Sequence, residues 1–371
     1  MATAQNWFEI ADIDKLDTPA LVLYPERVKH NLALLTGMID NVSRLRPHIK
    51  SHKNGEVLKL NMAAGISKFK CATIAEAELG GICKVPDVLL AYQPTGPKLQ
   101  RFINLIKNYP NTRYSCLVDN IDTAKAIAAS AAENSITIPV YIDLNVGMNR
   151  TGIIPGDGTL QLYAEVDQLA TLILIGLHAY DGHIHDADIE ARKARCAEAF
   201  DPVRELLQQL KAKGYSPKVI AGGTPTFPIH ALWEDVECSP GTFIYWDANY
   251  EALFEEQPFL PAALLVSRIV SLPADGVICT DLGHKSVASE SELSKRVMFL
   301  NAPELKSISH SEEHLVLQVA ENHDYKVGDV LYGLPFHVCP SVALYERVVI
   351  IDKNYIAGEW HNTARDRKIN Y

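Results

Sequence analysis

Strand-like and helix-like segments alternate from about residue 45 to residue 247, and this alternation limits the folds open to the chain. Eight apolar runs are typical of strands, at 45–52, 68–73, 87–92, 113–119, 139–146, 172–183, 217–223 and 237–245. Helices are expected between them, for example over 121–134, where Asp119 and Asn120 provide a cap, and over 188–213. Eight strands that alternate with helices predict an α/β fold, a parallel (β/α)8 barrel.

The pattern changes after about residue 256. Short runs rich in β-branched residues follow, around 264–266, 276–279, 314–319 and 347–351. They predict a smaller antiparallel β domain, to which the apolar run 20–24 could also belong. The spacing of Val28, Leu32, Leu35 and Ile39 predicts a helix over 26–39. We expect a barrel domain over 20–255 and a β domain over 256–371, with residues 1–19 packed on the β domain.

Charge and composition exclude several classes of partner. The 371 residues carry a net charge of −10 and include no basic block, so we expect no nucleic-acid partner. The apolar runs are shorter than a membrane span, and residues 1–7 show no charged-then-apolar signal pattern. The seven cysteines lie at irregular spacing and predict no disulfide framework, which favours a cytoplasmic location.

Lys50 is the first candidate for chemistry. Strand alternation over 45–50 places Arg46, His48 and Lys50 on one face, with Lys50 at the C-terminal end. Barrel enzymes carry their catalytic groups at the C-terminal ends of strands. A desolvated amine near other cations has a lowered pKa and reacts with aldehydes. An exposed lysine is the more frequent case for this residue type alone, and Lys53 is a rival beyond the strand end.

Two glycine-containing loops follow the last two predicted strands. Residues 221–226 read Ala-Gly-Gly-Thr-Pro-Thr, and residues 239–242 read Ser-Pro-Gly-Thr. Loops at these positions of a barrel often bind phosphate through backbone N–H groups. A Gly-Gly pair alone is usually only a turn, so the prediction depends on the two loops together.

Polar side chains also follow predicted strands five and six. Arg150 lies just beyond strand five and could bond a phenolate oxygen, or be a plain surface arginine. Strand six carries His178 and ends at His183, and His185 follows two residues later. The last two could form a metal pair, although buried hydrogen bonds or cofactor contacts are the more frequent roles.

His337 and Cys339 are separated by one residue. In an extended segment their side chains point to the same side, and imidazole with thiolate suits Zn²⁺. The alternative to a metal site is a structural pair, in which a buried cysteine lies beside a partly buried histidine.

Residues 46–53, Arg-Pro-His-Ile-Lys-Ser-His-Lys, resemble the RPHxKTHK signature of fold-type III pyridoxal-phosphate enzymes, with serine in place of threonine. The branch that they resemble contains the metal-activated D-threonine aldolases and the eukaryotic-type D-serine dehydratases. The similarity continues in order through 72–78, 180–183, 222–226, 240–242, 281–285 and 337–340, so it covers nearly the whole chain.

This resemblance implies a barrel of the alanine racemase type, a C-terminal antiparallel β domain, and a homodimer with active sites at the subunit interface. It implies that Lys50 carries pyridoxal 5'-phosphate covalently, and that a divalent metal is bound, with Zn²⁺ first and Mn²⁺ or Mg²⁺ as alternatives. The remaining residues are then assigned as cofactor-binding (Arg150, Tyr180, Gly223, Thr224, Gly241, Thr242) and as metal ligands (His337, Cys339).

The resemblance also implies a lyase that acts on a small D-3-hydroxy amino acid. In dehydration Lys50 would remove the Cα proton, and in retro-aldol cleavage a base such as His183 would take the hydroxyl proton. In the family that the chain resembles, the metal-ligand pair of the dehydratases is similar to His-x-Cys and that of the aldolases to His-x-Asp. Cys339 therefore favours dehydration. A racemase is one alternative, although residues 237–241 lack the arginine that alanine racemases place there. A non-catalytic pyridoxal-phosphate protein is the other, but such proteins resemble the barrel alone.

Overall fold

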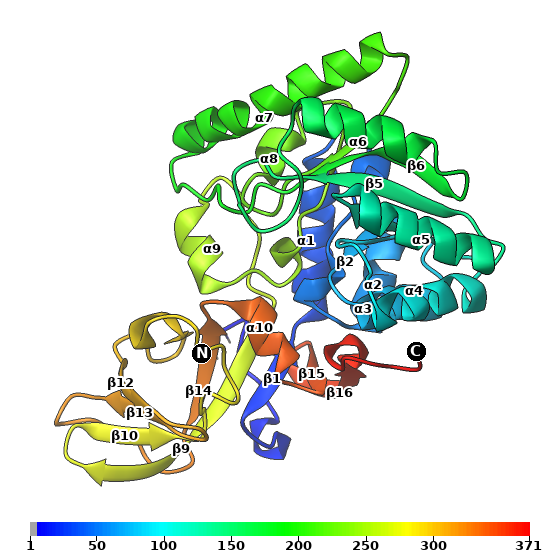
Figure 1. Ribbon diagram of the computed structural model, residues 1–371. Helices are drawn as coiled ribbons and strands as arrows, with labels where there is room; N and C mark the ends of the chain where they lie inside the picture. Colours follow the sequence, from blue (N-terminus) through cyan, green and yellow to red (C-terminus); the bar gives the residue numbers. More distant parts are fainter. Residues whose placement is uncertain (1–5) are drawn as a thin grey trace. The chain divides into compact units, whose positions relative to one another are not determined.

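The computed structural model describes residues 6–371, which form two compact units that interleave along the sequence (Figure 1). The barrel unit comprises Leu35–Lys50, Gly55–Gly241 and Asp366–Tyr371. The sheet unit comprises the chain up to Leu34, together with Ser51–Asn54 and Thr242–Arg365. The predicted two-part fold, an α/β barrel of alanine racemase type and a β domain, is confirmed.

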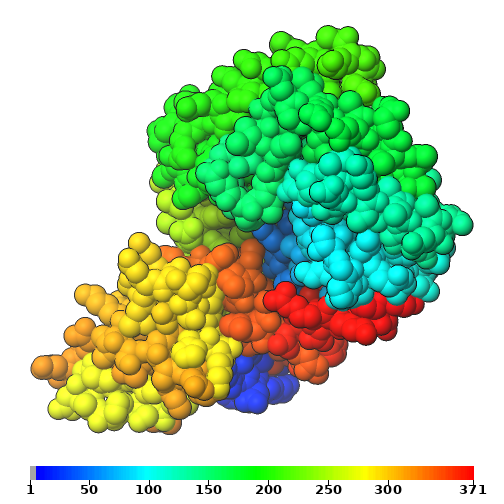
Figure 2. Space-filling view, in the orientation of Figure 1, coloured from blue at the N-terminus to red at the C-terminus, as the bar shows by residue number. Residues whose placement is uncertain are grey.

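The barrel unit is built on a parallel sheet in which strands are ordered as they occur in the sequence. Its strands are β2 (Lys68–Cys71), β3 (Asp87–Leu90), β4 (Arg113–Val118), β5 (Ile138–Leu144), β6 (Leu172–Ala179), β7 (Lys218–Ala221) and β8 (Val236–Cys238). Its helices are α2 (Gly55–Ala63), α3 (Ile74–Ile82), α4 (Pro97–Asn108), α5 (Ile121–Glu133), α6 (Asp157–Asp167), α7 (Ile189–Ala212) and α8 (Phe227–His230). Figure 2 shows the outside of this unit, where the cyan-to-green segments that contain α4 to α7 form a continuous surface.

The strand predicted at 45–52 is wrong in detail, because the segment forms only single bridges. Leu45 bridges Cys238 of β8, and His48 bridges Lys70 of β2, both in parallel orientation. The segment therefore joins the last strand of the sheet to the first, at the place of the eighth strand. Pro47 has no N–H to donate to a ladder, and a short 3-10 helix at Ile49–Ser51 ends the extended stretch.

The predicted helices are confirmed, and their ends follow the cap residues. The side chain of Asn120 accepts a hydrogen bond from the Thr123 N–H at the start of α5, and Asp188 accepts one from Ala191 N–H at the start of α7. The N-terminal helix α1 (Pro25–Gly37) contains Val28, Leu32 and Leu35, which are all buried.

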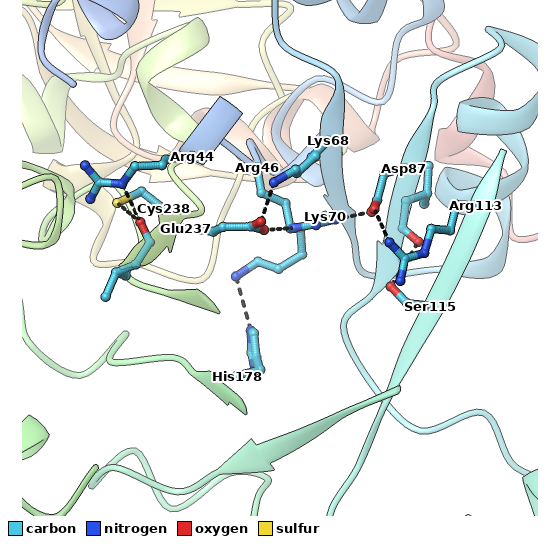
Figure 3. A network of polar contacts seen from close by, with 12 residues as sticks. Arg44, Arg46, Lys68, Lys70, Asp87, Arg113, Ser115, His178, Glu237 and Cys238 are labelled. Carbon is cyan, nitrogen blue, oxygen red and sulfur yellow. Dashed lines mark hydrogen bonds and ion pairs between the residues drawn. The ribbon is translucent and has the colours of Figure 1, made fainter. Parts of the chain in front are cut away.

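A network of ions lies inside the barrel unit, near the start of the strands (Figure 3). Arg46 is 1% exposed, and its guanidinium donates to Glu237 of β8 at 2.9 Å and to Asp87 of β3 at 2.5 Å. Lys68 of β2 forms a second ion pair with Glu237. Burial lowers the pKa of Arg46, but the two carboxylates outweigh it and raise that pKa above its ordinary value. Glu237 has a lowered pKa because these cations outweigh its own burial.

The sheet unit contains a mixed sheet in the order β12-β13-β10-β9-β1-β15-β16, with β14 paired to β9 and β11 paired to β14. Its strands are β1 (Ala20–Leu23), β9 (Ala263–Ala274), β10 (Val277–Thr280), β11 (Val297–Phe299), β12 (Lys306–His310), β13 (Leu315–Gln318), β14 (Val330–Pro335), β15 (Arg347–Asp352) and β16 (Tyr355–His361). The run 20–24 does supply a strand of this sheet, since β1 pairs antiparallel with β9 and parallel with β15.

Apolar side chains from distant parts of the chain form the core of the sheet unit. Val22, Val266, Leu334 and Ile351 come from four strands and pack in one buried cluster, which Phe8 joins. All seven cysteines are free, as the sequence predicted. Within residues 6–371, we find no helix with the length and apolar character that crossing a bilayer requires.

Candidate active site

The barrel unit contains a cavity of about 210 Å³ at the C-terminal ends of its strands. Ala72 follows β2, Ala91 follows β3, Arg150 follows β5, and Tyr180 follows β6 directly. Lys50 also lines this cavity, although it lies in a 3-10 turn and not in a regular strand. The structure thus brings together Lys50, Arg150 and Tyr180, three residues that the sequence singled out.

The ring of Tyr180 lies among three cationic groups. The Lys50 Nζ is 5.8 Å from the ring centre, the Lys70 Nζ is 5.1 Å away, and the Arg150 Cζ is 5.1 Å away. Contacts of this kind are favourable because a cation is attracted to the face of an aromatic ring. The cavity is therefore strongly cationic, which suits a ligand with several negative charges.

Lys70, His178 and Asp143 form a buried chain of titratable groups, and Figure 3 shows the contact between Lys70 and His178. Sequence reasoning noted His178 but missed Lys70 and Asp143. The Lys70 Nζ lies 3.4 Å from His178 Nε2, and His178 Nδ1 lies 2.7 Å from Asp143 Oδ1. Both Lys70 and His178 line the cavity. Their position in the sequence could have identified them, because Lys70 and His178 lie at or near the C-terminal ends of predicted strands two and six.

The loops after β7 and β8 contact each other at the predicted phosphate site. The Gly241 N–H donates to Thr224 Oγ1 at 3.0 Å, and Ser239 N–H donates to the Ala221 carbonyl at 3.2 Å. Gly222 has φ +73°, a conformation that favours glycine. The hydroxyl of Ser239 is buried and has no hydrogen-bond partner within the described residues. Buried polar atoms are almost always bonded, so this hydroxyl has the capacity for a further hydrogen bond at the loop.

A second buried cluster supports the loop after β7. Asp181 accepts a hydrogen bond from Thr226 Oγ1 at 2.9 Å, and its other oxygen lies 2.7 Å from His230 Nε2. Thr226 in turn accepts from the Gly223 N–H at 3.2 Å. With Cys196, Asp181 and His230 form a group that could ligate a metal ion, but their present bonds already satisfy both carboxylate oxygens. The pKa of Asp181 is lowered because His230 and Thr226 outweigh its burial.

His183, the predicted base, lines a different cavity. That cavity has a volume of about 240 Å³ and includes Val146, Arg195 and Glu198. Burial lowers the pKa of His183, and its Nδ1 has no hydrogen-bond partner within the described residues. The structure therefore does not bring His183 to the cavity of Lys50.

His337 and Cys339 lie together in the sheet unit, but not in the extended loop that the sequence suggested. His337 is the N-cap of α10 (Val338–Ala343), and Cys339 lies in the first turn of this helix. Burial lowers the pKa of His337, but Cys339 and Glu290 outweigh it and raise that pKa to about 9. Glu290 Oε1 lies 2.5 Å from His337 Nδ1.

Two hydroxyl groups of the same unit surround the thiol of Cys339. The Ser51 Oγ lies 3.3 Å from its Sγ, and the Thr242 Oγ1 lies 3.6 Å from it. Thr242 was predicted to bind phosphate, and its hydroxyl instead contacts the thiol in this structure. Ser51 directly follows Lys50 in the sequence, and Thr242 directly follows Gly241.

Comparisons with known proteins agree with this architecture. The chain matches the family model "Alanine racemase, N-terminal domain" over residues 24–249 and "Putative serine dehydratase domain" over residues 262–351. The second match includes His337 and Cys339.

Two curated relatives and one solved structure illustrate the similarity. The chain is 25% identical to a D-threonine aldolase of an Arthrobacter species over 95% of this chain and 93% of that protein. It is 28% identical to the D-threo-3-hydroxyaspartate dehydratase of Delftia sp. (strain HT23) over 62% of both. The structure superposes on the D-threonine aldolase from Filomicrobium marinum with a TM-score of 0.88 and 27% identity, over 98% of this chain and 99% of that chain. The chain therefore belongs to the family of the alanine racemase N-terminal domain.

Proposed function

We propose that this protein is a lyase that depends on pyridoxal phosphate and a divalent metal and acts on D-3-hydroxy amino acids. The observation that carries the proposal is the cationic cavity at the strand ends, in which the amine of Lys50 lies near Tyr180 and Arg150. The match to the dehydratase domain and the aldolase and dehydratase relatives support the reaction class.

The residues around the cavity fit pyridoxal phosphate. Lys50 would bind its aldehyde, Arg150 would donate to its phenolic oxygen, and Tyr180 would contact it. The loops after β7 and β8, which contain Gly223, Thr224 and Gly241, would hold the phosphate. The orphaned hydroxyl of Ser239 beside these loops supports a ligand rich in hydrogen-bonding oxygens.

When bound, this cofactor supplies a sink for the electron pair left on the substrate's Cα. The chain's own residues accept and donate the protons of the reaction. Lys50 holds at its Nζ the proton that it removes from Cα, and Arg150 keeps a positive charge beside the cavity.

His337 and Cys339 fit a divalent metal. Imidazole and thiolate are the ligands that Zn²⁺ prefers, and a site with two protein ligands leaves positions for substrate. Glu290 contacts the Nδ1 of His337, which fixes the imidazole so that its Nε2 can bind metal. A divalent ion bound there would supply Lewis-acid chemistry. Manganese and magnesium are the alternatives to zinc.

Dehydration is the reaction that we favour, because the cysteine at position 339 and the dehydratase-domain match both support it. Retro-aldol cleavage is the second candidate, favoured by the superposition on a D-threonine aldolase. The same residues serve both reactions. Dehydration breaks the bond between Cβ and oxygen, whereas retro-aldol cleavage breaks the bond between Cα and Cβ.

One assay distinguishes the two candidates. Purified protein with pyridoxal phosphate and Zn²⁺ or Mn²⁺ is incubated with D-serine, D-threonine or D-3-hydroxyaspartate. Ammonia and a 2-oxo acid indicate dehydration, whereas glycine and an aldehyde indicate cleavage. Interconversion of stereoisomers without either product would instead indicate a racemase and contradict the proposal.

We also infer a homodimer in the cytoplasm. The dimer rests on the family resemblance and is tested by light scattering of the purified protein. The seven free cysteines support a reducing compartment, and fractionation of the native cells tests it.

A further inference from the structure

Lys70 is a second buried amine at the cavity, and the roles proposed so far leave it unused. Its side chain is 3% exposed, and it lines the cavity together with Lys50. No carboxylate among residues 6–371 forms an ion pair with it. Lysines are rarely buried without such a partner, because a buried charge costs free energy. Its position therefore calls for a function beyond packing.

The groups around Lys70 fix its amine in one orientation. Asp143 accepts the proton of His178 Nδ1, which leaves His178 Nε2 as an acceptor for the Lys70 amine. The ring of Tyr180 lies 5.1 Å from the Lys70 Nζ. Lys50 and Arg150 on the cavity wall, and Asp181 farther off, are the other charged groups that act on it. Lys70 is thus held by a pair of side chains on β5 and β6, and it faces the cavity.

The same surroundings set the protonation of Lys70. Burial is the larger cause and Lys50 the next, and together they lower the pKa of Lys70 to about 7. Both the ammonium and the free amine are therefore present near neutral pH. An acid–base group is most effective when its pKa lies near the working pH.

We propose that Lys70 is the acid–base residue that serves the 3-oxygen of the substrate, a role that rests on the proposed lyase function. In dehydration, Lys50 removes the Cα proton and the C–O bond breaks, with its electron pair going to oxygen. The Lys70 ammonium gives that oxygen a proton, so water leaves and Lys70 becomes the free amine. Solvent returns the proton between turnovers.

In retro-aldol cleavage, the direction of proton transfer is reversed. The free amine of Lys70 takes the 3-hydroxyl proton, the Cα–Cβ bond breaks, and its electron pair stays with Cα. Lys50, as its ammonium, then protonates Cα, and glycine and an aldehyde leave. Lys70 gives the hydroxyl proton to solvent, and Lys50 takes one up, before the next turnover. The structure favours Lys70 over His183 for this work, because His183 lines the other cavity. It also favours Lys70 over His178, which is hydrogen-bonded at both ring nitrogens.

Two variants and one control test the role. Lys70→Met removes the amine and keeps the length of the side chain, whereas Lys70→Arg keeps the positive charge but stays protonated at neutral pH. Lys193→Met is the control, because Lys193 is an exposed surface lysine paired with Glu190. Far-UV circular dichroism establishes that each variant folds. If Lys70→Met does not fold, the turnover and exchange measurements are made on Lys70→Arg alone.

The first measurement is independent of activity. The full-length protein without cofactor is produced with ¹³C-labelled lysine, and the lysine side-chain resonance absent from Lys70→Met is titrated by NMR. We expect a midpoint near 7. A midpoint near the ordinary value of 10.5 would overturn the proposal.

The second measurement compares turnover with exchange. We expect both Lys70 variants to turn over a D-3-hydroxy amino acid at least about 100-fold more slowly than the wild type. Exchange of the Cα proton of D-alanine in D₂O, which needs no 3-oxygen, should stay within about threefold of wild type, as an acid–base group at the 3-oxygen contributes nothing to it. Restored turnover in Lys70→Arg, or equal loss of exchange and turnover, overturns the role of Lys70. Failure of the wild type on every D-3-hydroxy amino acid overturns the lyase function itself, whatever the NMR titration shows.

Discussion

Replacement of Arg46 by methionine should strongly destabilise the barrel unit. Arg46 is 1% exposed and bonds two carboxylates, Glu237 and Asp87, which are 9% and 17% exposed. Removal of one partner of a buried ion pair costs about 3–5 kcal/mol, because the other charge is left without a partner. Lys68 stays beside Glu237, and Arg113 lies 3.9 Å from Asp87, so we expect the lower end, about 3 kcal/mol.

Urea unfolding followed by circular dichroism measures this loss directly. With an m-value of about 3 kcal/mol per molar, the midpoint should fall by roughly 1 M. The exposed variant Lys193→Met should change the free energy of unfolding by no more than about 0.5 kcal/mol. The double variant Arg46→Met/Glu237→Gln should be less destabilised than the sum of the two single variants, by about 1 kcal/mol or more.

The loss should also depend on pH in a defined direction. The pKa of Glu237 in the folded protein lies below its ordinary value of 4.5. Its contribution to stability is therefore present above pH 4.5 and disappears as the pH falls through the folded pKa. The difference between wild type and Arg46→Met should be largest near neutral pH and should narrow in acid. A loss below about 1 kcal/mol, or a difference that grows in acid, would refute the reasoning.

Other changes test the site. Lys50→Ala should abolish both the covalent absorbance of added pyridoxal phosphate and turnover, and a spectrum identical to wild type would exclude Lys50 as the attachment point. Asp181→Asn should weaken cofactor binding by about ten- to a hundredfold, because the loop after β7 loses a charged acceptor worth about 1.5–3 kcal/mol, and fluorescence titration measures this. Dialysis against a chelator, or Cys339→Ala, should remove bound metal and turnover together, and activity that persists in metal-free protein would contradict the metal role. His183→Asn should change turnover less than threefold, and a loss of about 100-fold or more would return it to the list of bases.

Strand and helix periodicity predicted the barrel well, since apolar alternation and cap residues act locally. The cap at Asn120 appears where the sequence placed it, and the helix expected over 188–213 begins with a cap at Asp188. The first barrel strand was wrong because Pro47 interrupts the ladder, so pairing there is limited to single bridges. Strands β11, β12 and β16 were missed because they are short or exposed, whereas β14 was missed although five of its six residues are buried.

The candidate site was predicted in part. Lys50, Arg150 and Tyr180 line one cavity because each follows a strand end, which a sequence reveals. His183 was assigned as a base from the family resemblance, which runs through 180–183, but it lines a different cavity. Lys70 was missed because a lysine that ends a strand looks the same in a sequence whether it is buried or exposed.

The central strand of the sheet unit has a consequence for synthesis of the protein. β1 pairs through Val22 with Leu264 of β9 and with Val349 of β15. A ribosome adds about 5–20 residues each second, so β15 is made roughly 15 to 65 seconds after β1. Until β9 is made, roughly 12 to 49 seconds after β1, a fully apolar strand has neither of its neighbours, and its open edges can pair with other nascent chains. We therefore expect this N-terminal segment to be where chaperones bind, and where truncated fragments of the protein aggregate.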